Sequence, residues 1–246
     1  MQLTTDAIVL HRVDYRDYDR MVTLFSPELG RIDAVARGCR KPTSPLMNSA
    51  EMFCAGQYTL HVSGGRHTIT QCEIKDSFFD LRLDYDRLLH GMYYLSLADM
   101  AALPDQSAPE VFFLLLKALA HLCYSGLDAR MLTACFEMRY MPLMGFRPMM
   151  DRCVICGTPV DGEGRFDEAR GGVVCLRCPS HAPRISAGAR RIIMKAPMTD
   201  YSVVPKLDGH PDWPEAARLY RPFVERRIER RFRQSAPDTP PTEEKQ

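Results

Sequence analysis

Four cysteines in the second half of the chain constrain its fold more than any other feature of the sequence. They form two pairs, Cys153-Val154-Ile155-Cys156 and Cys175-Leu176-Arg177-Cys178, with eighteen residues between them. This is the spacing of a four-cysteine metal site, in which each CxxC turn points two thiolates at one tetrahedral centre. Gly157 follows the first pair, where a tight turn needs a positive φ. The pattern predicts a small, loop-rich module folded around one ion.

The ligand set also limits what the ion can do. Four sulfur ligands in tetrahedral geometry favour Zn2+, with iron as the minor alternative. Because four thiolates leave no position for water, we expect a structural role. A zinc deaminase needs His-x-Glu and Pro-Cys-x-x-Cys, whereas Arg152 and Val174 precede the two pairs here. A redox-switching disulfide pair fits the same spacing. The other five cysteines stand singly among apolar neighbours, as reduced core thiols do: Cys39, Cys54, Cys72, Cys123 and Cys135.

The first 78 residues alternate short β-rich runs with turn signals. Ser26-Pro27-Glu28-Leu29-Gly30 and Ser63-Gly64-Gly65-Arg66 have the composition of turns between strands. Residues 42–53 are expected to form a short helix, which lies near the middle of the region between the third and fourth predicted strands. This arrangement predicts a five-stranded OB-type barrel, a fold that commonly binds single-stranded nucleic acid or oligosaccharide, although an SH3-like barrel gives a similar pattern. The predicted strands are 7–10, 21–25, 32–36, 58–62 and 68–74.

From residue 79 the apolar residues follow a helical period. Pro104, Pro109 and Gly126 mark breaks between helices, and Ser186 is placed to cap a later helix over 186–195. The fold class is therefore α+β, with an N-terminal OB-fold barrel, a central all-α helical domain and an inserted four-cysteine zinc module. The predicted domains are the barrel at 1–78, helices at 79–150, the zinc module at 151–183, further helices at 184–233 and a disordered tail at 234–246.

Composition excludes several classes of protein. Hydrophobic residues make up 46% and charged residues 26%, so the chain can bury a core and wholesale disorder is excluded. The apolar stretches 88–98 and 111–127 are respectively too short to span a bilayer and interrupted by Lys117. No secretory segment begins the chain, so we expect a cytoplasmic protein with no membrane partner. The chain has no phosphate-binding glycine loop, nucleophile elbow or HExxH helix, so we expect binding and not enzymatic catalysis.

The distribution of charge is more informative than the net charge of +1. Arg31, Arg37, Arg40 and Lys41 converge within eleven residues at the end of the third predicted strand. On an OB barrel this loop borders the ligand groove, where cations follow phosphates and aromatic side chains stack on bases. The alternative is a solvated surface whose cations are neutralised by neighbouring aspartates, with the aromatic residues in the core. The candidate stacking residues are Tyr15, Tyr18, Phe53 and Tyr58.

A second basic region runs from residue 218 to residue 233. Apolar side chains recur there every four residues, and Arg226, Arg227 and Arg230 lie on the remaining faces of the predicted helix. Pro222 suits the start of this helix or a kink in it. Such a basic amphipathic helix can bind nucleic acid, lie on an anionic membrane or pack as a terminal helix with a solvated face. The pattern by itself leaves all three open.

Several of these motifs together resemble those of the RecO family of bacterial recombination mediators. Glu28-Leu29-Gly30-Arg31 and Val35-Ala36-Arg37-Gly38 are similar to the family's N-terminal strand pattern. The passage from Leu143-Met144-Gly145-Phe146-Arg147-Pro148 to Cys156-Gly157 resembles its approach to the first zinc knuckle, and Gly171-Gly172-Val173-Val174-Cys175 its second. The resemblance spans about residues 6 to 195. Arg37 stands where lysine is usual, and Cys39 where a small residue is common.

The resemblance implies a role in DNA repair and homologous recombination. It implies ATP-independent binding of single-stranded and double-stranded DNA, annealing of complementary strands, and a cytoplasmic, nucleoid-associated location. The implied partners are RecR and the single-stranded DNA-binding protein SSB, with RecA loaded indirectly. It also places the family's basic strand-three loop on Arg37, Arg40 and Lys41, with Arg31 beside them. The alternative function is a zinc-containing protein-interaction scaffold without direct DNA contact.

Overall fold

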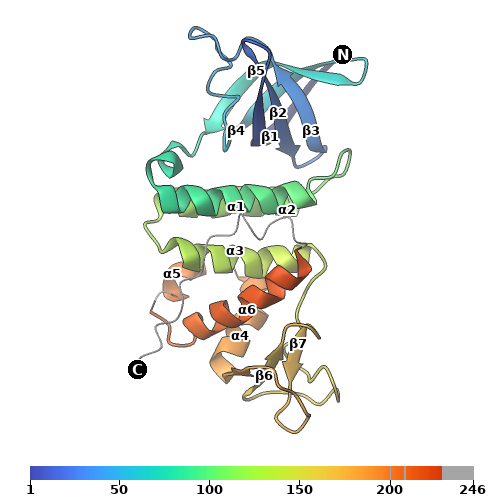
Figure 1. The fold of residues 1–246 in the computed structure, drawn as a ribbon, viewed down its shortest axis with the longest axis vertical. Coiled ribbons are helices and arrows are strands. Elements are labelled where there is room, and N and C mark those ends of the chain that lie inside the picture. Colours follow the sequence, from blue (N-terminus) through green and yellow to red (C-terminus); the bar gives the residue numbers. More distant parts are fainter. Residues whose placement is uncertain (200, 208, 229–246) are drawn as a thin grey trace. The chain divides into compact units, whose positions relative to one another are not determined.

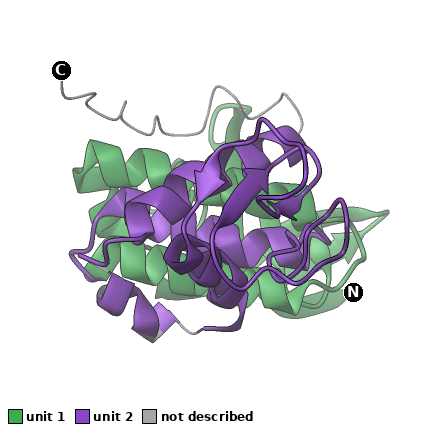
Figure 2. Ribbon diagram, turned by 90° about the horizontal axis from the view of Figure 1, so that it is seen from below, with its two compact units in different colours: residues 1–124 green, residues 125–246 purple. Residues whose placement is uncertain are grey.

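The chain forms two compact units, residues 1–124 and residues 125–246, which Figure 2 distinguishes by colour. The structure, a computed structural model, describes residues 1–199, 201–207 and 209–228. The predicted disordered tail at 234–246 and Arg230 lie outside these described residues. Within the described ranges, no helix has the length and apolar character that crossing a membrane requires.

The first unit begins with a closed barrel of five strands (Figure 1). The strand order is β1-β2-β3-β5-β4, and every neighbouring pair is antiparallel except β3 and β5, which are parallel. The predicted five-stranded OB-type barrel and both predicted turns are confirmed. The observed strands are longer than predicted because their hydrogen bonding continues past the buried positions: β1 (Gln2–Tyr15), β2 (Asp19–Ser26), β3 (Gly30–Ala36), β4 (Ala55–Ser63) and β5 (Arg66–Asp76).

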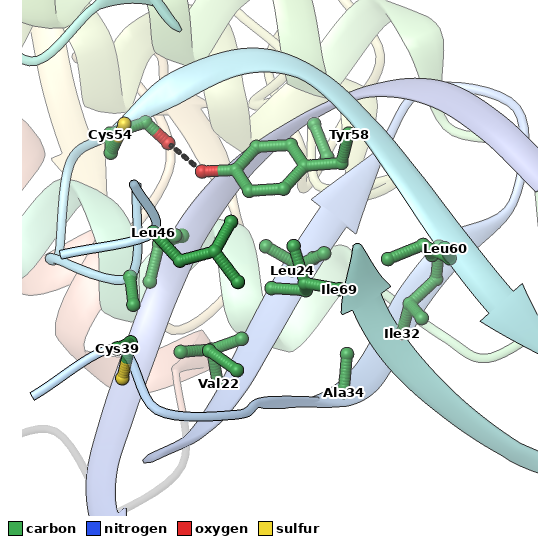
Figure 3. Packing of buried hydrophobic residues seen from close by; sticks show 14 residues of the cluster. Val22, Leu24, Ile32, Ala34, Cys39, Leu46, Cys54, Tyr58, Leu60 and Ile69 are labelled. Atoms are coloured by element: carbon green, nitrogen blue, oxygen red, sulfur yellow. Dashed lines mark hydrogen bonds between the residues drawn. The ribbon is translucent and has the colours of Figure 1, made fainter. Parts of the chain in front are cut away.

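The barrel interior is filled by apolar side chains from the strands and from the segment that joins β3 to β4 (Figure 3). This segment folds as successive turns in place of the predicted short helix, and it contributes Leu46, Ala50 and Cys54 to the core. The Tyr58 hydroxyl donates hydrogen bonds to the backbone oxygens of Ser49, at 2.8 Å, and Cys54, at 3.2 Å. Tyr58 therefore anchors the joining segment from inside the barrel.

Two α-helices and one short 3-10 helix follow the barrel in the first unit, and the two α-helices pack against each other. The Asp84 carboxylate caps the first of them by accepting a hydrogen bond from the Arg87 amide at 3.1 Å. The loop between the helices binds the turn between β2 and β3, because the Arg31 amide donates to the Leu103 oxygen at 3.2 Å. Gly30 precedes this contact with φ +66, and any Cβ there would lie 2.0 Å from that oxygen. The helical elements are η1 (Phe79–Leu83), α1 (Tyr85–Ala101) and α2 (Pro109–Tyr124).

The second unit combines helices with a small three-stranded sheet in the order β7-β6-β8. The predicted cap at Ser186 is confirmed, since its hydroxyl accepts a hydrogen bond from the Ala189 amide at 3.0 Å. Pro222 lies inside α6 and not at its start, and α6 begins at Trp213. The elements are α3 (Ala129–Leu143), β6 (Gly164–Asp167), β7 (Gly172–Val174), β8 (Arg184–Ile185), α4 (Ala187–Lys195), η2 (Ala196–Met198), η3 (Tyr201–Val203), α5 (Val204–Leu207) and α6 (Trp213–Arg227).

Candidate metal centre and nucleic-acid interface

The four predicted ligand cysteines meet at one point in the second unit. The sulfur atoms of Cys153, Cys156, Cys175 and Cys178 all lie within 4.8 Å of one another. The Sγ atoms of Cys156 and Cys175 are 3.8 Å apart. In a tetrahedron with metal–sulfur bonds of about 2.3 Å, the sulfur atoms are about 3.8 Å apart, so the site matches that size. The residues therefore fit a single structural metal ion with a closed, all-sulfur coordination shell.

Backbone geometry forms the two turns that present these sulfur atoms. In the first turn the Gly157 amide donates to the Cys153 oxygen at 2.8 Å, and Gly157 has the predicted positive φ, at 71°. In the second turn the Cys178 amide donates to the Cys175 oxygen at 3.2 Å. Each turn thus brings its two thiols to the same side of the backbone. Strand β7 ends at Val174, so the second turn begins directly after the sheet.

The electrostatics of the site favour thiolate at the first ligand. Burial by itself raises the pKa of the Cys153 thiol, but hydrogen bonds from the backbone at Cys175, Cys156 and Ile155 outweigh it and lower that pKa to about 6. The thiolate is the form that binds a metal ion. Backbone amides therefore favour the ligand form of Cys153 near neutral pH.

Two guanidinium groups of the second unit contact the loops around the four cysteines, residues 151–183, which we call the metal module. Arg190 of α4 is 5% exposed and donates to the backbone oxygens of Gly162, Asp161 and Met150. Arg227 of α6 donates to the Glu168 oxygen at 2.9 Å and lies 3.6 Å from the centroid of the Phe223 ring. Both residues therefore link helices of the second unit to the loops around the cysteines.

The predicted basic loop lies beside the turn between β1 and β2 in the first unit. The Arg40 amide donates to the Tyr18 oxygen at 3.0 Å, and the Gly38 amide donates to the Asp19 carboxylate at 2.8 Å. The Arg40 guanidinium also donates to the Arg16 backbone oxygen at 3.4 Å. These contacts join two segments into one surface. We call it the hairpin surface and define it by Tyr15, Arg16, Tyr18, Arg37, Arg40 and Lys41.

The cations of the hairpin surface differ in how far they are neutralised. Arg40 lies 3.4 Å from Asp14, but the strongest influence on that carboxylate is a hydrogen bond from Arg20, which lowers the pKa of Asp14. Arg16, Arg37 and Lys41 form no ion pair among the residues that the structure describes. The neighbouring aspartates therefore neutralise only part of this surface. Arg16 was not identified from the sequence, because it stands alone among acidic and aromatic neighbours and contributes to no charge run.

Arg31 faces a different environment from the other three cations of the predicted loop. Its guanidinium lies 2.7 Å from the Asp99 carboxylate of α1 and 3.4 Å from that of Asp33. Asp99 is also 3.4 Å from the imidazole of His11. Arg31 therefore takes part in the contact between the barrel and α1.

The candidate stacking residues divide into two groups. Phe53 and Tyr58 are 1% and 0% exposed, so neither ring can stack on a ligand base. Tyr15 and Tyr18 are 40% and 53% exposed and belong to the hairpin surface. Phe53 and Tyr58 are therefore core residues, whereas Tyr15 and Tyr18 lie on the surface. In the second basic region, Arg226 is exposed near the end of α6.

Comparison with known proteins places both units in one family. A sequence model described as "Recombination protein O N terminal" matches residues 1–78, and one described as "Recombination protein O C terminal" matches residues 82–236.

Individual relatives agree with this result. A protein of Syntrophomonas wolfei named "DNA repair protein RecO" is 34% identical over 182 residues, which cover 74% of this chain and 72% of the relative. The protein of that name from Moorella thermoacetica is 28% identical over 237 residues, covering 94% and 88%. That of Acetivibrio thermocellus is 29% identical over 194 residues, covering 78% and 77%. The barrel, the cysteine site and these matches together show that the chain belongs to the RecO family.

Proposed function

We propose that this protein is a recombination mediator in DNA repair that binds DNA strands through the hairpin surface and promotes their annealing without ATP. The observation that carries the proposal is a group of cations, only partly neutralised, on an OB-type barrel. Cationic grooves on such barrels bind the phosphate backbone without reading sequence. The relatives named "DNA repair protein RecO" support the part of this proposal that concerns DNA repair.

Annealing requires no covalent chemistry from the protein. Base pairing and stacking release about 1.4 kcal/mol per base-pair step, so the reaction is favourable once two strands meet. The barrier lies in the mutual repulsion of two polyanions. Side chains that neutralise phosphates lower this repulsion and raise the encounter rate. We infer that Arg37, Arg40 and Lys41 make these phosphate contacts, with Arg16 beside them.

The remaining predicted DNA contacts take smaller parts in this proposal. Arg31 is paired with two carboxylates that neutralise its charge, so we assign it no phosphate contact of its own. Arg227 binds the metal module, whereas the exposed Arg226 is available to a second stretch of DNA. Arg230, outside the described residues, belongs to the same predicted basic region.

The resident ion in this proposal is one structural Zn2+ held by Cys153, Cys156, Cys175 and Cys178. Sulfur ligands in tetrahedral geometry suit zinc, and four of them leave no open position for substrate. The ion supplies folding free energy to a module that is too small to bury a large core. The partners that we propose are RecR, SSB and, through loading onto SSB-coated DNA, RecA.

Charge reversal on the hairpin surface tests the DNA-binding proposal. The triple variant Arg37→Glu, Arg40→Glu, Lys41→Glu should lose most binding to labelled oligonucleotides. It should also lose most annealing of SSB-coated strands, whether or not ATP is present. In the unmodified protein, log Kd should rise linearly with log salt, with a slope of about 0.9 per duplex phosphate contacted. The matched control reverses three exposed arginines of the second unit, Arg130, Arg147 and Arg191, so the change in net charge is equal.

The outcome also separates the proposal from its rival, the protein-interaction scaffold. One observation favours that rival, since Ile155 and Leu176 at the tips of the two cysteine turns are 42% and 50% exposed. Exposed apolar side chains can mark a protein-docking surface. If the hairpin triple variant anneals DNA as well as its control does, the DNA-binding role of this surface is wrong.

A further inference from the structure

The two exposed tyrosines of the hairpin surface give it a feature that phosphate binding alone does not use. Tyr15 and Tyr18 are 40% and 53% exposed, whereas Phe25, Phe53 and Tyr58 of the same barrel unit are at most 1% exposed. Burying an aromatic ring is favourable, and these two stay exposed on a barrel, residues 1–78, that buries its other large rings. They are therefore candidates for contact with a ligand.

A cation lies next to each of these rings. The Lys41 ammonium is 5.3 Å from the centroid of Tyr18, and the Arg16 guanidinium carbon is 5.0 Å from the centroid of Tyr15. The surface thus offers the same pair of groups twice, a flat ring and a positive charge within a few ångströms. A nucleotide offers the complementary pair, a flat base and an anionic phosphate. Base stacking on aromatic side chains is independent of sequence because every base has a π face.

The backbone holds this arrangement in place before any ligand binds. Tyr15 is paired with Asp19 at the end of the β1–β2 ladder. The Tyr18 backbone oxygen accepts a hydrogen bond from the Arg40 amide at 3.0 Å, which links the ring-bearing turn to the loop that carries Arg37 and Lys41. A preformed site loses less conformational entropy on binding than a flexible one. The rings and the cations are therefore presented together.

We propose that Tyr15 and Tyr18 stack on unpaired bases, so that the hairpin surface selects single-stranded over double-stranded DNA. The bases of a duplex are already stacked on one another, and a duplex offers this surface only its phosphates. A single strand offers both its phosphates and its base faces. This inference rests on the proposed function, because it assigns the ligand class of the same surface.

The test compares three labelled DNA probes of equal length by fluorescence anisotropy: a mixed-sequence single strand, an abasic single strand and a duplex. The unmodified protein should bind the mixed-sequence strand more tightly than the other two. The variant Tyr15→Leu, Tyr18→Leu should bind the mixed-sequence strand at least about 5-fold more weakly. Its affinity for the abasic strand and the duplex should not change, and neither should its salt slope, because the phosphate contacts remain.

Two matched variants control for other effects of these substitutions. Tyr15→Phe, Tyr18→Phe keeps both rings and should bind like the unmodified protein. Tyr85→Leu removes a tyrosine that is 76% exposed at the start of α1, outside the hairpin surface, and should have no effect on any probe. Thermal unfolding of each variant, followed by circular dichroism, checks that the barrel remains folded.

The possible results separate this inference from the proposed function. If the leucine variant binds all three probes like the unmodified protein while the charge-reversed triple variant does not bind, stacking is refuted and the phosphate-binding role stands. If the leucine variant weakens binding of all three probes equally, the rings only shape the loop, and the selectivity is refuted. If the charge-reversed triple variant binds normally, the proposed function fails and this inference fails with it.

Discussion

Among single residues, Asp99 shows how the structure pairs Arg31, a cation that the sequence placed in a candidate ligand site. Its carboxylate lies 2.7 Å from Arg31 and 3.4 Å from His11, so three side chains from β1, β3 and α1 meet there. Burial opposes ionisation of Asp99, but the hydrogen bond from His11 and the Arg31 charge outweigh it and hold its pKa below the ordinary value of 3.8. The ionised carboxylate therefore stabilises the folded first unit.

We predict that Asp99→Asn lowers the free energy of unfolding at pH 7 by about 1–2 kcal/mol, because it removes a partly buried ion pair. The folded-state pKa is depressed, so the carboxylate contributes its full stability above pH 3.8 and loses it as the pH falls through the lower, folded-state value. Urea unfolding of both proteins from pH 7 downward measures this difference, which should shrink at the acidic end.

The control for this prediction is Asp33→Asn, which removes the second carboxylate near Arg31. Asp33 is 56% exposed on its side chain and lies 3.4 Å from the guanidinium. Exposed ion pairs contribute between about 0 and 1 kcal/mol, so its effect should be smaller. Equal stability losses for the two variants, or a loss at Asp99 that does not depend on pH, would contradict the assignment.

At the scale of elements, helix α4 and the metal module depend on one buried side chain. Arg190 donates to three backbone oxygens, at Met150, Asp161 and Gly162, which lie before and after the first cysteine turn. These carbonyls lie in loops, so no hydrogen bond of a regular sheet or helix supplies them with a donor. A buried carbonyl without a donor costs about 1–3 kcal/mol. The guanidinium therefore lets an irregular loop pack against a helix.

We predict that Arg190→Ala lowers the stability of the second unit by about 2–4 kcal/mol, because it leaves several buried carbonyls without their donor. Arg190→Lys keeps the charge but loses the planar fork, so it should give an intermediate loss. Arg191→Ala changes the exposed neighbour and should alter stability by less than about 0.5 kcal/mol. Guanidinium unfolding followed by tryptophan fluorescence measures all three. A loss no larger for Arg190 than for Arg191 would refute this role.

At the scale of the whole molecule, the chain offers a probe that reports on one unit only. Its single tryptophan, Trp213, is 8% exposed at the start of α6 in the second unit. The metal module contacts α6 through Arg227 and through the ring of Phe166, whose centroid is 6.0 Å from that of Phe223. Unfolding of the metal module should therefore change the fluorescence of Trp213. The hairpin surface belongs to the first unit, so the same unfolding should leave it unchanged.

We predict that a strong zinc chelator lowers the unfolding temperature seen by Trp213 fluorescence by several degrees, because metal binding contributes folding free energy. DNA affinity, measured below that temperature, should change less than about 2-fold. Cys153→Ser should contain less bound metal by elemental analysis and should unfold at the same temperature with and without chelator. If the chelator does not change the unfolding temperature that Trp213 fluorescence reports for the unmodified protein, the four cysteines do not stabilise this unit through a metal.

Much of the fold follows from local sequence patterns. The two CxxC turns, the turn at Gly64 and Gly65 and the cap at Ser186 are each specified by a few consecutive residues, and all are present in the structure. The five strands were predicted because alternation and turn residues are local signals as well. The strand ends were less predictable, since hydrogen bonding between β1 and β2 continues to Tyr15 where the buried pattern has stopped.

The candidate binding surface shows what local patterns leave undetermined. Arg31, Arg37 and Arg40 look alike in the sequence, yet Arg31 pairs with Asp99, sixty-eight residues away, and Arg37 has no such partner among the described residues. Tyr18 and Tyr58 look equally able to stack, and only the barrel buries the second of them. The sequence alone specified the four clustered cysteines and the barrel, because those depend on short-range spacing. Which cations and rings remain available depends on the fold, because charge pairing and burial involve residues brought together from distant parts of the chain.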